Sequence, residues 1–170
     1  MVTAIAMPSL SEFRVKMRVD NEIAQLQRMV LTTRNTAINL EQNVTLCPLN
    51  GSNTCTNNWA GELTVFVDLD QDNIFEPGAV PAEILIKIKK AVSTTDTLNY
   101  TGFSRITFAS TGLLLINSGS GSGTFSYCPN GYSHLNRAVI VSPSGRTYQS
   151  TDTDNDGEDE DRNNSAITCP

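Results

Sequence analysis

Residues 44–72 read VTLCPLNGSNTCTNNWAGELTVFVDLDQD. This stretch contains two closely spaced cysteines, Cys47 and Cys55, then a run of β-branched and aromatic residues, and finally three aspartates at alternate positions. The β-branched and aromatic run fits a strand, which we expect over residues 62–68. The combination is typical of three kinds of feature, namely a redox site, a metal site or a stapled structural element.

The four cysteines of the chain allow three pairings, and only the near-neighbour spacing of Cys47 and Cys55 favours one of them. Neither this pair nor Cys128 with Cys169 has the two-residue spacing of a redox motif or a zinc knuckle. The single histidine, His134, adds little to a metal site. We therefore expect two disulfides, formed in an oxidising compartment such as the bacterial periplasm. The alternative is a cytosolic chain with four free thiols.

Upstream of this stretch, the sequence predicts one long amphipathic helix. Ser9 and Glu12 have the spacing of a capping box at its start. Apolar residues then recur at steps of three and four along one face. They are Leu10, Phe13, Met17, Val19, Ile23, Leu26, Val30 and Ala37. Such a helix is about 45 Å long at 1.5 Å per residue, so part of it is expected to project from a domain of this size.

Downstream of residue 40 the pattern changes to short strands separated by turn residues such as Pro143-Ser144-Gly145. Short links favour antiparallel pairing. The expected strands cover residues 42–46, 62–68, 84–90, 105–109, 113–117, 124–128, 137–142 and 146–149. The sequence therefore predicts an α+β fold, in which a long N-terminal helix (1–41) packs on an antiparallel β domain (42–170) with an acidic C-terminal segment (151–170).

The composition fits one soluble domain. The 170 residues are 39% apolar, enough for a core, and no apolar run approaches the roughly 20 residues of a membrane span. Seven of the eighteen acids lie within 152–161, and the remaining eleven nearly balance the twelve basic residues. This balance predicts no strong general attraction to nucleic acid. His134 has no identifiable nucleophile to activate, so we expect no enzymatic activity.

Two groups of alternating aspartates are candidate cation sites. Asp152, Asp154 and Asp156 precede a glycine, as in the opening of a calcium loop, where a turn brings carboxylates around one hard cation. The twelfth position is Asn163 instead of the bidentate Glu of an EF-hand. We therefore favour a solvated acidic loop here, with bound calcium as the alternative. The group at 68–72 lacks the glycine, and we expect an exposed hairpin tip there.

A set of short segments also follows a characteristic order along the chain. The segments are AIAMPS at 4–9, VTLCP at 44–48, WAG at 59–61 followed by VFVD at 65–68, EIL at 83–85, RITF at 105–108, GTF at 123–125 with Cys128, and RAVIVS at 137–142 with GR at 145–146. This order resembles the GspH/FimT family, the minor pilins and pseudopilins of bacterial type IV pili and type II secretion systems. The FimT- or FimU-like minor pilins are the most similar.

The resemblance implies a type IV pilin-like fold and further segments ahead of this chain. Family members carry a short basic leader that a prepilin peptidase removes, then an apolar helix that anchors the subunit in the inner membrane and later packs in the fibre core. We expect this chain to be an ectodomain that begins near the end of that helix. Leu10, Phe13 and Met17 are then expected to form an assembly surface, because an exposed apolar stripe marks an interaction site.

The same resemblance implies a structural function. We expect a minor pilin that helps to initiate or cap a type IV pilus-like fibre, and a type II secretion minor pseudopilin of the GspH type is the alternative. The expected partners are other minor and major pilins or pseudopilins, and the inner membrane through the apolar helix. The expected location is the inner membrane with a periplasmic domain, then the pilus or pseudopilus. No cofactor is required.

The resemblance also implies disulfides between Cys47 and Cys55 and between Cys128 and Cys169. The second would clasp the acidic tail to the sheet.

DNA binding for uptake is a further alternative, because some FimT-like pilins are linked to it through a C-terminal Gly-Arg-x-Arg segment. Here residues 145–148 read GRTY, so the second Arg is missing, and seven acids follow closely. The candidate phosphate contacts are Arg146, Lys87 and Lys89, and Tyr148 is a candidate for stacking on a base. We favour solvated charges on strand faces over a DNA-binding patch.

Overall fold

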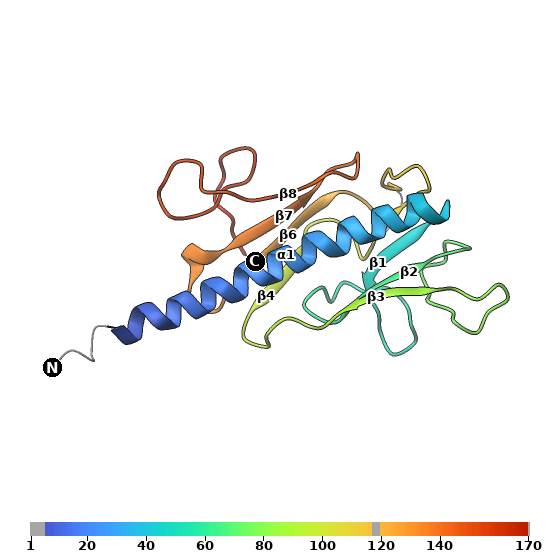
Figure 1. Cartoon of the computed structure of the whole chain (residues 1–170), viewed down its shortest axis with the longest axis horizontal. Helices are drawn as coiled ribbons and strands as arrows, with labels where there is room; N and C mark the ends of the chain where they lie inside the picture. Colours follow the sequence, from blue (N-terminus) through green and yellow to red (C-terminus); the bar gives the residue numbers. More distant parts are fainter. Residues whose placement is uncertain (1–5, 117–119, 170) are drawn as a thin grey trace.

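A single long helix packs along two four-stranded sheets in the computed structural model (Figure 1). The structure describes residues 6–116 and 120–169, and the side chains of the helix from residue 10 onward. The helix, α1, covers Ala6–Leu40, and antiparallel strands follow it. This architecture confirms the predicted α+β fold. In the described part of the chain, no helix is both long enough and apolar enough to cross a membrane.

The first sheet has the strand order β3-β2-β1-β5, with antiparallel neighbours. Its strands are β1 (Val44–Pro48), β2 (Leu63–Val67), β3 (Leu85–Lys89) and β5 (Ile106–Phe108). Every residue of β1 and β2 is buried, whereas most of the edge strand β3 is exposed. The apolar run in residues 63–67 is thus a central strand covered on both faces, which explains why it does not alternate with polar residues.

The second sheet has the order β4-β6-β7-β8 and is also antiparallel. Its strands are β4 (Thr97–Tyr100), β6 (Gly123–Cys128), β7 (Arg137–Val141) and β8 (Thr147–Gln149). A short 3₁₀ helix, η1 (Ser133–Leu135), lies between β6 and β7.

Three local predictions are wrong. The strand expected at 113–117 is absent from residues 113–116, where only an isolated bridge joins Leu114 to Phe108, and residue 117 lies outside the described residues. Strand β4 is not predicted. The capping box is also not the helix start, because α1 already runs through Ser9 and Glu12 instead pairs with His134.

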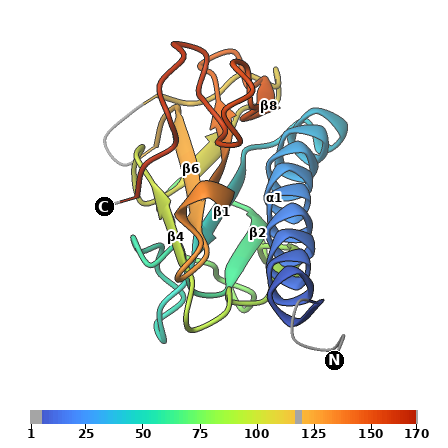
Figure 2. The same ribbon diagram turned by 90° about the vertical axis from the view of Figure 1, so that its left-hand side faces the viewer.

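One face of α1 packs on the β domain along most of its length, as Figure 2 shows from the end. Its buried apolar residues, from Val15 onward, follow the helical period and lie on this one face. They are Val15, Val19, Ile23, Leu26, Met29, Val30 and Ala37. Arg34 Nη1 also donates to the carbonyl of Gly145, at 3.3 Å, which ties the helix to the turn between β7 and β8.

An aromatic cluster joins the two sheets. The Trp59 ring, from the connection between β1 and β2, lies 5.0 Å from the ring of Tyr100 and 5.2 Å from that of Phe125, centroid to centroid. Trp59 Nε1 donates to the carbonyl of Phe103, at 3.2 Å, so the buried indole is satisfied. Because Tyr100 and Phe125 belong to β4 and β6, Trp59 connects the loop of one sheet to the core of the other.

Candidate functional site

The N-terminal part of α1 extends beyond the sheets (Figure 1) and carries exposed apolar side chains. Leu10, Phe13 and Met17 are 61%, 58% and 55% exposed. Their spacing of three and four residues places them on one side of the helix. Val15 and Val19, between and beyond them, turn toward the β domain and are buried. This segment therefore has two apolar faces, one of which packs within the chain.

Polar contacts hold this exposed segment against the β domain. Glu12 Oε1 lies 2.8 Å from His134 Nε2 of η1. Further along the helix, Arg18 Nε lies 2.8 Å from Asp96 Oδ2. The Asp96 carboxylate is buried and also accepts a hydrogen bond from the hydroxyl of Tyr127. Burial, followed by this contact with Asp96, raises the pKa of Tyr127, so the phenol stays protonated as a donor.

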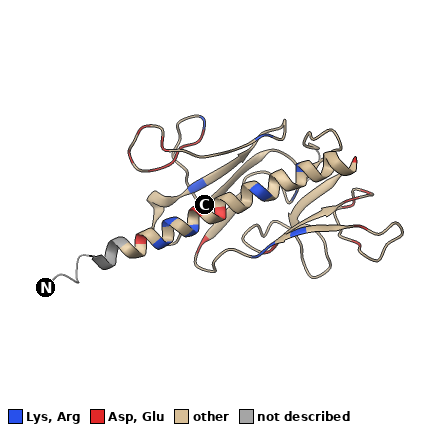
Figure 3. Ribbon diagram, in the orientation of Figure 1, with Lys and Arg blue, Asp and Glu red and all other residues tan. Residues whose placement is uncertain are grey.

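The three candidate phosphate contacts do not form one patch. Lys89 is buried, and its Nζ lies 2.6 Å from Glu22 Oε2 of α1, so it is not available to DNA. Lys87 and Arg146 are exposed, but they lie in the edge strand of one sheet and next to the edge strand of the other. Figure 3 shows Lys and Arg scattered over the molecule.

Tyr148 is also occupied within the chain. The guanidinium carbon of Arg162 lies 3.4 Å from the centroid of its ring, in a cation–π arrangement. A base that stacked on this face would have to displace Arg162. The sequence carries no local signal for this contact, because fourteen residues separate the partners.

Two disulfides staple the β domain at different levels. Cys47 of β1 is joined to Cys55, with a Cα–Cα distance of 5.5 Å, and closes the loop that follows the strand. Cys128, the last residue of β6, is joined to Cys169, with a Cα–Cα distance of 6.4 Å. The second bond holds the end of the C-terminal segment against the second sheet. These are the pairs that the family resemblance implies.

The C-terminal segment folds back on itself and brings four carboxylates together. Asp152, Asp154, Asp156 and Glu160 each offer an oxygen within 4.8 Å of the others. Glu160 is absent from the sequence-based candidate set, and it arrives through an isolated bridge to Thr151. The carboxylates of this loop already accept backbone hydrogen bonds, for example Asp152 Oδ1 from the N–H of Asn155, at 2.7 Å. The three aspartates are exposed.

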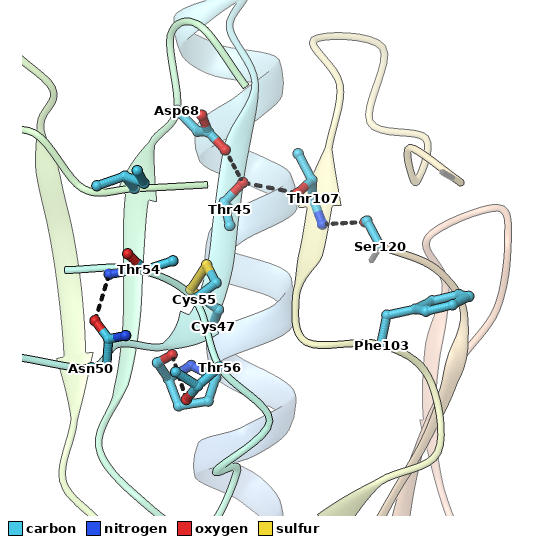
Figure 4. The surroundings of a disulfide bond; sticks show 12 residues. Thr45, Cys47, Asn50, Thr54, Cys55, Thr56, Asp68, Phe103, Thr107 and Ser120 are labelled. Carbon is cyan, nitrogen blue, oxygen red and sulfur yellow. Dashed lines mark hydrogen bonds between the residues drawn. A yellow bond between two sulfur atoms is a disulfide. The ribbon is translucent and has the colours of Figure 1, made fainter. Parts of the chain in front are cut away.

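The sequence predicts that the acidic group after β2 lies at an exposed hairpin tip, and the structure agrees for only part of the group. Asp70 and Asp72 are exposed, but Asp68 is fully buried. Asp68 Oδ2 accepts a hydrogen bond from Thr45 Oγ1, at 2.9 Å, and that hydroxyl lies 2.8 Å from Thr107 Oγ1. Figure 4 shows this chain of polar groups running from Asp68 across β1 to β5. The expectation is thus wrong for Asp68, whose burial follows from its position at the end of a central strand.

Comparison with known proteins agrees with this architecture. Residues 22–145 match the family model described as Type II transport protein GspH. The fold is similar to that of the Pseudomonas aeruginosa type IV minor pilin FimU in two crystal forms. One form has a TM-score of 0.61 at 19% sequence identity, over 82% of this chain and 92% of FimU. The other has a TM-score of 0.57 at 19% identity, over 78% and 92%. No curated protein sequence matches the chain.

Proposed function

This chain belongs to the GspH family, and we propose that it is a minor pilin that helps to initiate or cap a type IV pilus-like fibre. Its partners in this proposal are other pilins of the same fibre. The apolar helix that family members carry ahead of this region would anchor it in the inner membrane before assembly.

The observation that carries the proposal is the exposed face formed by Leu10, Phe13 and Met17. Burying one such side chain contributes about 1.5–3 kcal/mol, so a face of three strongly favours association. A soluble monomer rarely keeps large apolar side chains together on a projecting helix. Pilin fibres pack subunits through their N-terminal helices, and this face lies on that helix.

The contacts of Glu12 and Arg18 with the β domain support the same proposal. They fix the direction in which the helix leaves the domain, because they join α1 to two different segments. Arg18 contacts Asp96, just ahead of β4, and Glu12 contacts His134 of η1. A helix held in one orientation loses less conformational freedom when it docks. The apolar face is thereby presented at a constant angle to neighbouring subunits.

Paired substitutions on this helix test the proposal. The change Phe13→Gln with Met17→Gln removes the apolar face, and Arg14→Gln with Lys16→Gln changes exposed residues of the same turns as a control. We expect the first pair to reduce fibre formation in the native bacterium and the control pair to leave it unchanged. Both should melt like the wild type, because all four side chains are exposed. Normal fibre formation by the Phe13/Met17 variant would overturn the proposal.

The type of machine is tested by the phenotype of the deletion strain. Loss of surface pili with normal protein secretion supports the pilus, as proposed here. Loss of type II secretion with normal pili would instead assign the chain to a pseudopilus.

A further inference from the structure

The connection between β2 and β3 brings three carboxylates together. Asp68 directly follows β2 and Glu83 lies just ahead of β3, and the register places Phe66 opposite Leu85. Because the two strands are antiparallel neighbours, Asp68 and Glu83 lie side by side at the same end of the sheet. Asp70 completes the group, and one oxygen from each of the three residues lies within 4.8 Å of the others.

Two of the three carboxylates are removed from water. Asp68 is 0% exposed and Glu83 is 6% exposed, whereas Asp70 is exposed. Both oxygens of Glu83 accept backbone hydrogen bonds, from the N–H of Leu69 at 2.9 Å and from that of Glu76 at 3.0 Å. These contacts fix the direction of the Glu83 carboxylate, and each oxygen keeps a lone pair for another partner.

Asp68 has an oxygen without a partner. Its Oδ2 accepts the hydrogen bond from Thr45, but Oδ1 is buried and has no hydrogen-bond partner among the described residues. The N–H groups of Gln71 and Asn73 lower the pKa of Asp68 from nearby without reaching Oδ1 in hydrogen-bond geometry. Burying a carboxylate oxygen without a hydrogen-bond donor costs free energy, and a ligand bound at that oxygen would offset this cost.

The charges around Asp68, Asp70 and Glu83 also favour a bound cation. Asp72 adds negative potential at Asp68, while Arg105 is the cation whose charge interacts with Asp68. Three carboxylates therefore lie together, two of them buried, and a bound cation would offset their negative charge.

We propose that Asp68, Asp70 and Glu83 form a binding site for a calcium ion. The ligands are all carboxylate oxygens, which hard divalent cations prefer. Ca²⁺ accepts six to eight oxygens in a flexible geometry, so carbonyls of the loop and water can complete its shell, whereas Mg²⁺ requires a near-ideal octahedron. The exposed side chain of Asp70 leaves the site open to solvent, so the ion can exchange.

The site is connected to the rest of the β domain. The carbonyl of Asn73 accepts a hydrogen bond from the N–H of Cys55, at 3.1 Å, and the N–H of Phe75 donates to the carbonyl of Asn53, at 2.9 Å. The acidic loop is thus tied to the loop that the Cys47–Cys55 disulfide closes. A bound ion would stiffen both loops, and this effect is independent of the pilin role proposed above.

The acidic group in the C-terminal segment has no counterpart of the buried, unpartnered oxygen of Asp68 among the described residues. Asp152, Asp154 and Asp156 are exposed, and among the described residues the carboxylates of these aspartates and of Glu160 have no buried oxygen without a donor. This contrast supplies a matched control for the experiment.

Calcium titration of the chelator-treated chain tests the site, by calorimetry and by thermal melting in about 5 mM CaCl₂, since extracellular calcium modules bind in the range of about 10⁻⁴–10⁻³ M. We expect the wild type to bind calcium more tightly than magnesium and to melt higher with it. Asp68→Asn, Asp70→Asn and Glu83→Gln should each weaken calcium binding by at least about tenfold. The control Asp152→Asn with Asp154→Asn should keep the full shift.

Two outcomes would overturn the site. One is a wild type that shows neither binding heat nor a melting shift at this calcium concentration, which would leave a proton as the balancing charge. The other is a calcium-induced rise in melting temperature that persists in Asp68→Asn and Asp70→Asn but disappears in the Asp152/Asp154 control. Asp70 is exposed, so its variant stays folded and keeps the test decisive even if a change at Asp68 unfolds the chain.

Discussion

Lys89 Nζ lies 2.6 Å from Glu22 Oε2, and this ion pair joins the edge strand β3 to the middle of α1. The side chain of Lys89 is only 3% exposed, and that of Glu22 is 16% exposed. Lys89 Nζ also donates to the carbonyl of Lys90, at 3.1 Å. A lysine at the edge of a sheet is commonly a solvated charge, but here it lies beneath the helix and depends on one carboxylate.

Removing Glu22 is expected to destabilise the fold strongly. The change Glu22→Ala leaves the Lys89 ammonium buried without its counter-charge, which costs about 3–5 kcal/mol in comparable pairs. Urea unfolding followed by circular dichroism measures the loss. The double variant Glu22→Leu with Lys89→Met removes both charges and should recover most of the stability. If Glu22→Ala unfolds at the wild-type urea concentration, the pair contributes nothing to the fold.

Most of the fold follows from local sequence patterns, and the exceptions have physical causes. The three-to-four-residue spacing from Val19 to Ala37 predicts the packed face of α1, because burial of one face repeats with the helical period. The start of the helix is predicted wrongly. Ser9 and Glu12 have the spacing of a capping box, but α1 already includes both residues. β4 is missed because its only buried residues are Leu98 and Tyr100, so four residues give too little pattern.

The two disulfides are expected to contribute unequally to stability. The Cys128–Cys169 bond spans 41 residues and the Cys47–Cys55 bond spans 8. In the chain-entropy model these separations correspond to about 4 and about 2.5 kcal/mol. Replacing each pair by serine and measuring urea unfolding checks the order. A larger loss for the Cys47–Cys55 variant would contradict the predicted order.

The candidate site is less predictable than the fold. The alternation of Asp68, Asp70 and Asp72 is visible in the sequence, but Glu83 joins the group only through the pairing of β2 with β3. Likewise, the burial of Lys89 depends on a helix more than sixty residues away in the chain. Such contacts are set by tertiary packing, so local patterns carry no signal for them.

DNA binding is expected to be weak and salt-sensitive. Lys89 is buried and only Lys87 and Arg146 of the three candidates are exposed, so few phosphate contacts are available, and a few such contacts are lost quickly as salt rises. Fluorescence anisotropy with a labelled duplex at about 20 mM and about 150 mM salt measures this. Binding that persists at the higher salt and falls with Arg146→Ala would contradict the prediction and favour an uptake role.

The stability of the calcium-free chain is expected to fall as pH rises above the ordinary carboxyl range. Burial raises the pKa of Asp68 from 3.8 and that of Glu83 from 4.5. The folded state therefore binds protons more tightly than the unfolded state. This contribution to stability is fully present below the unfolded pKa and is lost as pH rises through the folded one. A tenfold difference in proton affinity between the two states corresponds to about 1.4 kcal/mol.

Asp68→Asn removes the Asp68 part of this effect, because the amide keeps the shape of the side chain and does not titrate. In chelator, the free energy of unfolding of the wild type should fall relative to that of Asp68→Asn as the pH rises above about 4, and calcium should restore it at neutral pH. Urea unfolding at several pH values, with and without calcium, gives the difference directly. A difference that stays constant with pH would mean that Asp68 titrates alike in the folded and unfolded chains, and its burial would then carry no electrostatic cost.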